Sequence, residues 1–352
     1  MMKNDANLWK KFTQSKIMMP LIALAVLLLY NLIFTKNFFA IEIKEGHLYG
    51  NLIDIIKRAT PIMLISIGLT LVIATKGIDI SVGSVVAISA STVAVLIGGN
   101  LIMKDGVQVF VTKTPIAIAI LAALFVALLA GMWNGMLVSR VGMQPIIATL
   151  ILFVAGRGIA QLITNGQIIT IYYKPFYYIA NGYLFGLPIT LYIVLILLII
   201  AIILTRKTPL GLYIESVGAN PTATRFSGIN AKNITFWCYA FCGLCAGIAG
   251  IIVCSNIRAA DGNNAGNLFE LDAILAVVLG GTALSVGRFY LIGSIIGALI
   301  IQTLTTSIYA IGVPPEIAQV VKAAVVFIVS IIQSDKFKSQ IFKIFRMKEI
   351  ST

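Results

Sequence analysis

Apolar runs long enough to cross a bilayer recur along this chain, and they restrict its fold more than any other feature. A helix needs about 20 apolar residues to cross the hydrocarbon core. With 59% hydrophobic and 11% charged residues over 352 positions, the composition is that of a polytopic membrane protein. We predict an all-α transmembrane domain over residues 17–333. Its ten expected crossings are residues 17–34, 51–75, 84–99, 115–138, 145–164, 188–204, 233–254, 271–284, 289–311 and 316–333.

The positive charge of the chain gathers in three segments. Residues 1–16 carry four Lys against one Asp, residues 205–232 carry four cations against one acid, and residues 334–352 carry five cations against two acids. Basic segments of membrane proteins stay on the cytoplasmic side. We therefore predict a cytoplasmic N-terminus, a cytoplasmic loop at 205–232 and a basic cytoplasmic tail at 334–352. The net charge of +13 then reflects membrane orientation and not nucleic-acid binding.

Two features suggest interrupted helices. The eighth segment, residues 271–284, is short for a crossing, and a re-entrant segment is tolerated only where it is buried in protein. In addition, Gly77–Gly83 (GIDISVG) and Gly281–Gly287 (GTALSVG) share a pattern. Transporters are often built from repeats whose broken helices meet at the pathway. We therefore expect an internal repeat, and the alternative is a coincidence between two Gly-rich stretches.

The polar loop 205–232 has the pattern of two short amphipathic helices. Gly211 and Gly228 are expected to punctuate them, and residues such as Leu212 and Phe226 give them an apolar side. Short amphipathic helices are typical ligands of a groove on a partner protein. The alternative from spacing alone is a solvated connection between two crossings.

The same loop resembles the coupling loop of bacterial ABC sugar-importer permeases of the ribose type. The likeness rests on the stretch from Leu210 to Asn230, although Pro221 and Thr224 depart from the usual pattern. Gly77–Gly83 resembles that family's GIDLSVG signature, and residues 270–281 resemble a second one. Residues 154–158, 161–164 and 260–266 are most similar to galactofuranose permeases.

This resemblance implies a permease subunit in a bacterial inner membrane, working with a second permease that is identical or a sister chain. A periplasmic sugar-binding protein would deliver a monosaccharide, and an ABC ATPase subunit would grip the loop. No GxxxxGK[ST] motif occurs, so ATP and Mg²⁺ are expected on the ATPase subunit and no cofactor in this chain. The residues expected to couple to the ATPase are Glu215, Gly218, Asn220, Arg225 and Gly228.

Polar residues inside the apolar runs are candidates for the translocation pathway, because ionisable groups are costly in a bilayer. Arg157 and Gln161 lie four residues apart and share a helix face, which together with Asn134 could line a polar path. The alternative is a hydrogen bond that holds helices together. Asp79 and Asp272 lie near the Gly-rich breaks and either accept sugar hydroxyls or pair with Arg288, Lys322 or Arg157. The predicted pathway set is Asp79, Ser81, Asn134, Arg157, Gln161 and Asp272.

A polar stretch at 258–267, RAADGNNAGN, lies in a connection expected on the outer face. Surface loops on a rigid bundle often carry recognition. We predict that this loop receives the binding protein through Arg258, Asp261, Asn263 and Asn264. The alternative is a solvated turn between helices.

Catalytic and metal sites are not expected. His47 is the single histidine, and the four cysteines have no His or carboxylate partners at ligand spacing. The alternative to an ABC permease is an ion-coupled secondary transporter, which would depend on intramembrane acids such as Asp79 and Asp272 and would need no partner at the cytoplasmic loop.

Overall fold

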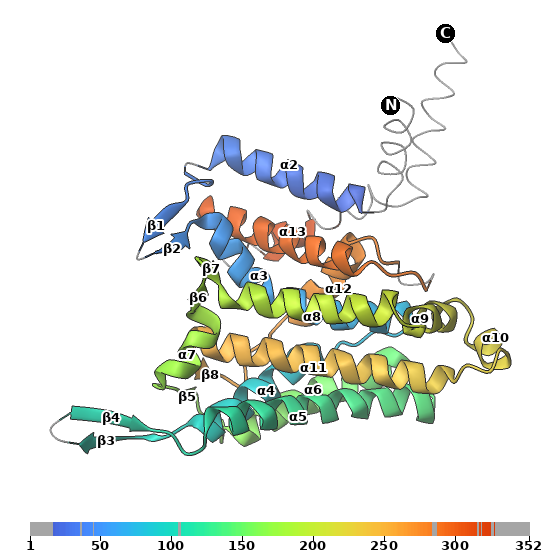
Figure 1. Ribbon diagram of the computed structural model, residues 1–352, viewed down its shortest axis with the longest axis horizontal. Helices are drawn as coiled ribbons and strands as arrows, with labels where there is room; N and C mark the ends of the chain where they lie inside the picture. The colour runs from blue at the N-terminus through green and yellow to red at the C-terminus, as the bar shows by residue number, and fades with distance from the viewer. Residues whose placement is uncertain are drawn as a thin grey trace, which may run out of the picture.

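The protein is described by a computed structural model over residues 17–35, 37–44, 46–104, 107–283 and 287–314, with residues 317, 319–324 and 327. Its helices run side by side along one axis, which lies horizontally in Figure 1. The predicted segments 1–16 and 334–352 lie outside the described residues. Most of the tenth expected crossing lies outside them as well.

Six helices of the described part are long and apolar enough to cross a membrane. Each coincides with an expected crossing, so these six predictions are confirmed as helices. They are α3 (Asn51–Ala74), α5 (Ile116–Met136), continued by the π-helical turn η1 (Leu137–Val141), α6 (Pro145–Ile163), α8 (Ile189–Arg206), α11 (Ala231–Ile257) and α13 (Leu291–Ala310).

Three further apolar helices are shorter. They are α2 (Met18–Phe34), α4 (Val82–Ile97) and α12 (Phe269–Leu279). At a rise of about 1.5 Å per residue, the 11 residues of α12 reach only about half the thickness of the hydrocarbon core. The short eighth segment is therefore a half-length helix followed by a connection to α13.

The connections hold short β-hairpins that the all-α prediction did not include. β1 (Glu42–Lys44) pairs with β2 (His47–Tyr49), β3 (Asn100–Lys104) with β4 (Val107–Val111), and β6 (Tyr183–Leu184) with β7 (Leu187–Pro188), all antiparallel. β5 (Ile169–Thr170) pairs with β8 (Ala259–Ala260) across two connections. Outside the helices the backbone groups still require partners, and hairpins supply them locally.

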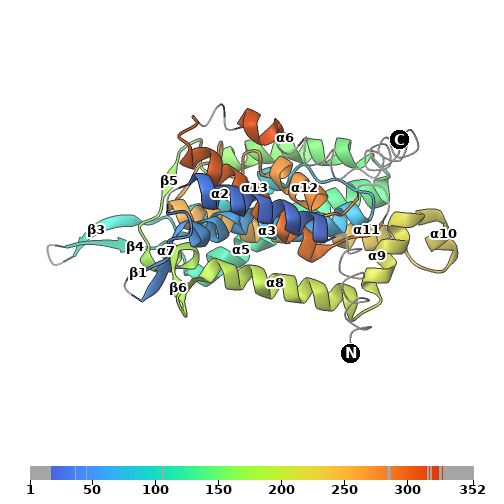
Figure 2. The ribbon, with the colours of Figure 1, turned by 90° about the horizontal axis from the view of Figure 1, so that it is seen from above.

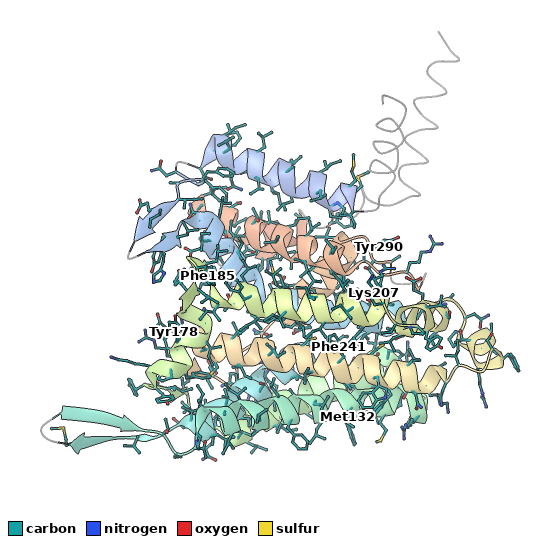
Figure 3. The ribbon with its side chains drawn as sticks, in the orientation of Figure 1. Met132, Tyr178, Phe185, Lys207, Phe241 and Tyr290 are labelled. Atoms are coloured by element: carbon teal, nitrogen blue, oxygen red, sulfur yellow. The ribbon has the colours of Figure 1, made fainter. Side chains whose placement is uncertain are left out.

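The connections segregate to opposite ends of the bundle. The hairpins and α7 (Lys174–Asn181) lie at one end, and α9 (Leu210–Ala219) with α10 (Pro221–Phe226) lies at the other (Figures 1 and 2). The labelled side chains agree, since Tyr178 and Phe185 lie at the first end and Lys207 at the second (Figure 3). All segments expected outside therefore share one end, and the basic loop takes the opposite one.

The core lies along α3, α11 and α13. Within their most apolar windows, 83%, 67% and 72% of residues are buried, against 22% to 28% for α5, α6 and α8. The outer helices therefore present apolar side chains to the surroundings, as expected of helices that face lipid. Small residues allow the close packing inside, since a Cβ at Gly131 of α5 would come within 3.0 Å of Gly243 Cα of α11.

The proposed repeat between Gly77–Gly83 and Gly281–Gly287 does not join equivalent positions. Gly77–Gly83 follows the long helix α3 and leads into the short helix α4, whereas Gly281–Gly287 follows the short helix α12 and leads into the long helix α13. Residues 284–286 lie outside the described part. The break that matches the one before α4 in order is residues 258–268, between the long α11 and the short α12.

Candidate functional site

The break before α4 is organised by Asp79, which is 1% exposed. Its Oδ1 accepts hydrogen bonds from the backbone N–H of Ser81 (2.9 Å), the hydroxyl of Ser81 (2.7 Å) and Nδ2 of Asn134 (3.3 Å). Asn134 Nδ2 also donates to Ser81 Oγ at 2.7 Å. Three residues of the predicted pathway set thus form one buried cluster, in which no Lys or Arg of the described residues pairs with Asp79.

Two further side chains support this break from neighbouring helices. Thr149 of α6 lies between Pro145 O and the backbone of the break, with its Oγ1 3.3 Å from both Ile78 O and Ile80 N. Tyr239 of α11 donates its hydroxyl to Ile78 O at 3.4 Å. The interrupted backbone is therefore satisfied by side chains, which is the condition for an unwound segment at membrane depth.

The outer loop 258–268 is ordered by its own polar side chains. Helix α11 ends at Arg258, whose φ of 55° turns the chain and whose guanidinium lies 3.7 Å from the ring centre of Tyr177. Asp261 accepts hydrogen bonds from the backbone N–H groups of Asn263 (2.9 Å) and Asn264 (3.3 Å) and from Asn264 Nδ2 (2.6 Å). Burial alone would raise the pKa of Asp261, but these bonds bring it below its ordinary value.

Arg157 and Gln161 are bound to this loop. Arg157 Nη1 donates to Asn263 O at 3.2 Å and to Ala265 O at 2.5 Å, and Gln161 Nε2 donates to Asn263 Oδ1 at 2.5 Å. Asn134 makes its contacts in the other cluster. The structure therefore separates Asn134 from this pair, and joins the pair to residues predicted to receive the binding protein. The roles assigned to both sets stay predictions.

Glu270 is a candidate that the sequence reasoning missed. It is the second residue of α12, only 3% exposed, and its Oε2 has no hydrogen-bond partner among the described residues. A Cβ at Gly83 of α4 would overlap this oxygen, so the amino-terminal ends of α4 and α12 meet at Glu270. The signal in the sequence is an acid at the start of a short apolar helix, within the second family signature at residues 270–281.

Asp272 is paired, as one of the two alternatives predicted. Both of its carboxylate oxygens lie 2.9 Å from Lys322 Nζ. The pair lines a pocket of about 360 Å³ between α12 and the second half of α13. Asp272 lies two positions after Glu270 on the same helix, so the two side chains point to opposite sides of α12.

The loop 205–232 contains the predicted helix pair. Asn220 joins the two helices, and its Oδ1 caps α10 by accepting from Thr222 N (3.0 Å) and Ala223 N (3.1 Å). Beyond α10, Gly228 turns the chain with a φ of +82°. Gly211, the other expected punctuation point, is the second residue of α9 and lies close against Thr205.

The outward surface of this loop is formed by α10. Phe226 is 89% exposed and Arg225 is also exposed. A pocket of about 580 Å³ lies beside them, lined by Thr222, Ile229, Lys232 and their neighbours. An exposed aromatic residue beside a cation is typical of an interface anchor.

The inward surface of the loop is formed by α9, which touches two distant segments. Lys76, directly after α3, donates to Ala219 O at 3.1 Å. A Cβ at Gly218 would overlap Ala74 O and come within 2.6 Å of Gly287 Cα. Helix α9 therefore rests at once on the end of α3 and on the connection between α12 and α13.

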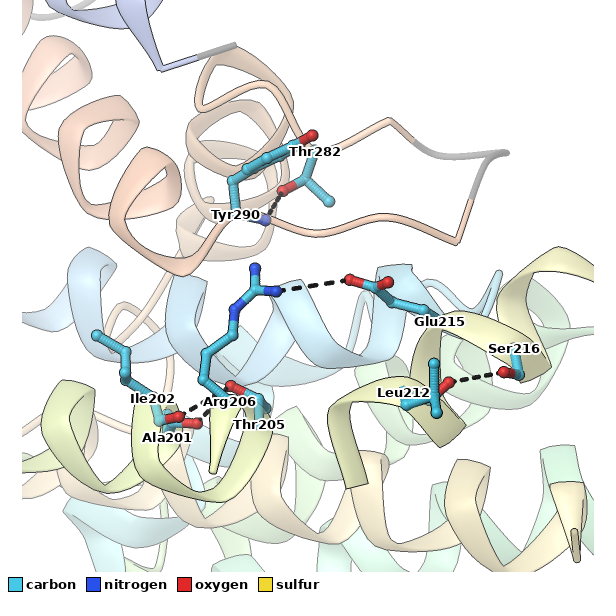
Figure 4. Close-up of polar contacts among 9 residues, drawn as sticks. All are labelled: Ala201, Ile202, Thr205, Arg206, Leu212, Glu215, Ser216, Thr282 and Tyr290. Atoms are coloured by element: carbon cyan, nitrogen blue, oxygen red, sulfur yellow. Dashed lines mark hydrogen bonds and ion pairs between the residues drawn. The ribbon is translucent and has the colours of Figure 1, made fainter. Parts of the chain in front are cut away.

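Two polar contacts border this surface (Figure 4). Arg206 Nη1 lies 4.0 Å from Glu215 Oε1, and Thr282 Oγ1 accepts from Tyr290 N at 3.0 Å. The ion pair is half-exposed, so its contribution to stability is small. Glu215 thus lies on the side of α9 that faces the 282–290 connection.

Comparisons with known proteins agree on one family. Residues 51–330 match the family model described as branched-chain amino acid transport system / permease component. The chain is 48% identical over 324 residues to the galactofuranose transporter permease protein YtfT of Escherichia coli K12, covering 92% of this chain and 91% of the relative.

Other relatives are similar over comparable lengths. The fructose import permease protein FruF of Bifidobacterium longum is 37% identical, covering 94% of this chain and 91% of its own. The ribose import permease protein RbsC of Escherichia coli K12 is 34% identical, covering 90% and 93%. No solved structure was found to match. Because the family model and these relatives cover nearly the whole bundle, the chain belongs to the branched-chain amino acid transport system / permease component family.

Proposed function

We propose that this chain is the membrane permease of an ATP-binding cassette importer that carries a monosaccharide across a bacterial inner membrane. The observation that carries the proposal is the agreement of the relatives, whose names specify permeases of galactofuranose, fructose and ribose. The identity of 48% to the galactofuranose permease favours a furanose-like hexose as the substrate.

The cytoplasmic loop supplies the coupling in this proposal. An ABC ATPase subunit, which would carry ATP and Mg²⁺, docks on α10 through Phe226 and Arg225. Because α9 contacts Ala74 and Gly287, a movement of the docked subunit reaches both the break before α4 and the connection after α12. Two permease chains, identical or sisters, would enclose the pathway between them.

The outer loop supplies the entry point. A periplasmic sugar-binding protein docks on the exposed side chains Asn263 and Asn264 and on Arg258. Since Arg157 and Gln161 hold this loop from beneath, docking there acts directly on the polar residues of α6.

An ion-coupled transporter receives less support. Of the two acids named for that alternative, Asp272 is paired with Lys322 and Asp79 is held by Ser81 and Asn134. Neither acid is left as a ready ion site in this arrangement.

Purification in mild detergent tests the proposal. We expect an ABC ATPase and a sugar-binding protein to accompany the chain, and the reconstituted assembly to import D-galactose, D-ribose or D-fructose only with ATP. Uptake driven by an ion gradient without ATP would favour the secondary transporter. Import of amino acids in place of sugars would contradict the substrate class.

A further inference from the structure

Glu270 presents a buried carboxylate oxygen that nothing satisfies. The residue is 3% exposed, and Oε2 has no hydrogen-bond partner in the part of the chain that the structure describes. The carboxylate receives backbone hydrogen bonds from Leu268 and Glu270, so the unmet demand is that of Oε2, and a buried polar atom left without a hydrogen bond is costly. A bound group that donates a hydrogen bond to Oε2 would remove this cost.

The surroundings of Glu270 are polar although they lie deep in the bundle. Ser84 of α4 donates to Phe153 O, near the middle of α6, so α4 begins at half the height of that helix. Gly83 and Gly266 leave room for the Glu270 carboxylate, because a Cβ at Gly83 would overlap Oε2 and approach Gly266 O at 2.5 Å. The amino-terminal ends of α4 and α12 therefore meet at one acid, where the helix dipoles favour negative charge.

Arg157 supplies the complementary donor. The loop brings it near Glu270, because Arg157 Nη1 binds Ala265 O and the next residue, Gly266, packs against Gly83, where the Glu270 carboxylate lies. The two side chains form no ion pair among the described residues. Nη1 is bound to Asn263 O and Ala265 O, whereas Nε and Nη2 have no acceptor within the described ranges. The guanidinium carries five N–H donors, so most of its capacity is unused.

We propose that Glu270 and Arg157 form a binding site for neighbouring hydroxyl groups of the transported sugar. The Glu270 carboxylate accepts a hydrogen bond from one hydroxyl, and the Arg157 guanidinium donates to the oxygen of the next. This assignment rests on the proposed function and names the residues that hold its substrate inside the membrane.

A neutral polyol fits this pair better than an ion does. A hard metal cation requires six or more oxygen ligands, and one carboxylate oxygen beside a guanidinium does not provide them. An anion would meet the negative charge of Glu270. A diol both donates and accepts, so it satisfies the acid and the base without net charge.

The loop 261–267 covers the site in this state. Gly266 packs against Gly83, and the carbonyl oxygens of Ala265 and Asn263 accept the hydrogen bonds of Arg157 Nη1. Displacement of the loop would release Arg157 Nη1 and open a route to Glu270. The loop on which the binding protein is proposed to dock is thus the same one that shields the sugar site.

The test is equilibrium binding of tritiated D-galactose, D-ribose and D-fructose to the permease–ATPase complex in lipid nanodiscs, without the binding protein. Glu270→Gln keeps the size of the side chain and removes its charge, and Glu270→Asp withdraws the carboxylate by one methylene. Asp54→Asn, at an exposed acid in the first turn of α3, is the matched control.

We expect Glu270→Gln to raise the Kd of the best-bound sugar about fivefold to tenfold, because a neutral amide oxygen accepts a weaker hydrogen bond from the hydroxyl than a carboxylate does. Asp54→Asn should leave the Kd unchanged. A Kd for both Glu270 variants within about twofold of the wild type would overturn the site. So would the absence of saturable binding by the wild-type complex.

Monodeoxy analogues separate direct binding from a structural role. One analogue should bind the wild-type complex more weakly than its parent sugar by at least this factor, and Glu270→Gln should weaken its binding little further. Equal losses for every analogue in both complexes would overturn direct contact. Import by the wild-type assembly with its binding protein reports on the proposed function separately, so a working importer with an indifferent Glu270 refutes only this site.

Discussion

Gly218→Ala is expected to uncouple ATP hydrolysis from transport while leaving the protein folded. The added Cβ would overlap Ala74 O and lie 2.6 Å from Gly287 Cα, and neither backbone can turn aside as a side chain can. Moving the added Cβ from 1.9 Å to an ordinary contact distance of 3.4 Å from Ala74 O requires α9 to shift by about 1.5 Å. Overpacking of this kind costs about 1–3 kcal/mol.

The stability change should nevertheless be modest. Replacing Gly by Ala inside a helix contributes about 1 kcal/mol in the opposite direction. The net loss is then about 0–2 kcal/mol, which a thermal unfolding curve in detergent would register as a small fall in Tm. The displaced α9 would lose its close contacts with the end of α3 and with the 282–290 connection. A movement of the ATPase would then no longer reach these two segments.

The assay is ATP-dependent sugar uptake by reconstituted vesicles, with ATP hydrolysis measured in parallel. We expect the ATPase to remain bound through α10. The amount of sugar transported per ATP hydrolysed should fall at least about tenfold, because a misplacement of about 1 Å can have an effect of this size or larger in a precisely arranged site.

Gly158→Ala is the matched control, since no atom lies within 4 Å of its added Cβ. It should raise stability by about 0.5–1 kcal/mol and leave uptake unchanged. Wild-type coupling in Gly218→Ala would refute the role given to α9.

Three further outcomes are expected. Asp79→Ala should lower the free energy of unfolding by about 3 kcal/mol, because it leaves the donors of Ser81 and Asn134 without an acceptor. Asp79→Asn keeps an acceptor and should cost less. Unfolding curves of both variants equal to that of the wild type would disprove the structural role of this cluster. Phe226→Asp should reduce the amount of ATPase that co-purifies with the chain, and undiminished recovery would remove α10 from the interface. Asp261 has a lowered pKa, so its contribution to loop stability is present above the unfolded pKa of about 4 and lost only as pH falls through the lower folded pKa. Stimulation of ATP hydrolysis by the sugar-loaded binding protein should accordingly stay constant from about pH 7 to pH 5, and Asp261→Arg should weaken it more at low salt than at high; a decline above pH 5, or no effect of the substitution at low salt, would contradict this.

The sequence could predict the features that depend on local properties of the chain. Hydropathy located six long helices, since each apolar run must be buried or face lipid wherever it packs. Charge counting grouped the hairpin-bearing connections at one end and the basic loop at the other. The helix pair at 210–226 followed from its amphipathic pattern, and the structure adds the cap at Asn220.

Other features required the folded chain. Helical spacing placed Arg157 and Gln161 on one face, but it could not show that this face meets Asn263, about 100 residues later. The repeat predicted at Gly281–Gly287 rested on similar residues and not on a similar order of helices. In the structure, the break that lies between a long and a short helix, as the break before α4 does, is the one before α12.

What the sequence by itself determined, then, is where the six long helices lie and which connections share an end of the bundle, because these depend on residues near in sequence. Only the tertiary structure decided which polar groups meet inside the bundle, and it left Glu270 unpaired against Gly83 while it paired Asp272 with Lys322. Two acids two residues apart look alike in a sequence. They differ in the fold because they point to different neighbours. In a bundle whose helices pack closely through glycine and alanine, those neighbours depend on how the helices approach one another, which the sequence of one helix does not reveal.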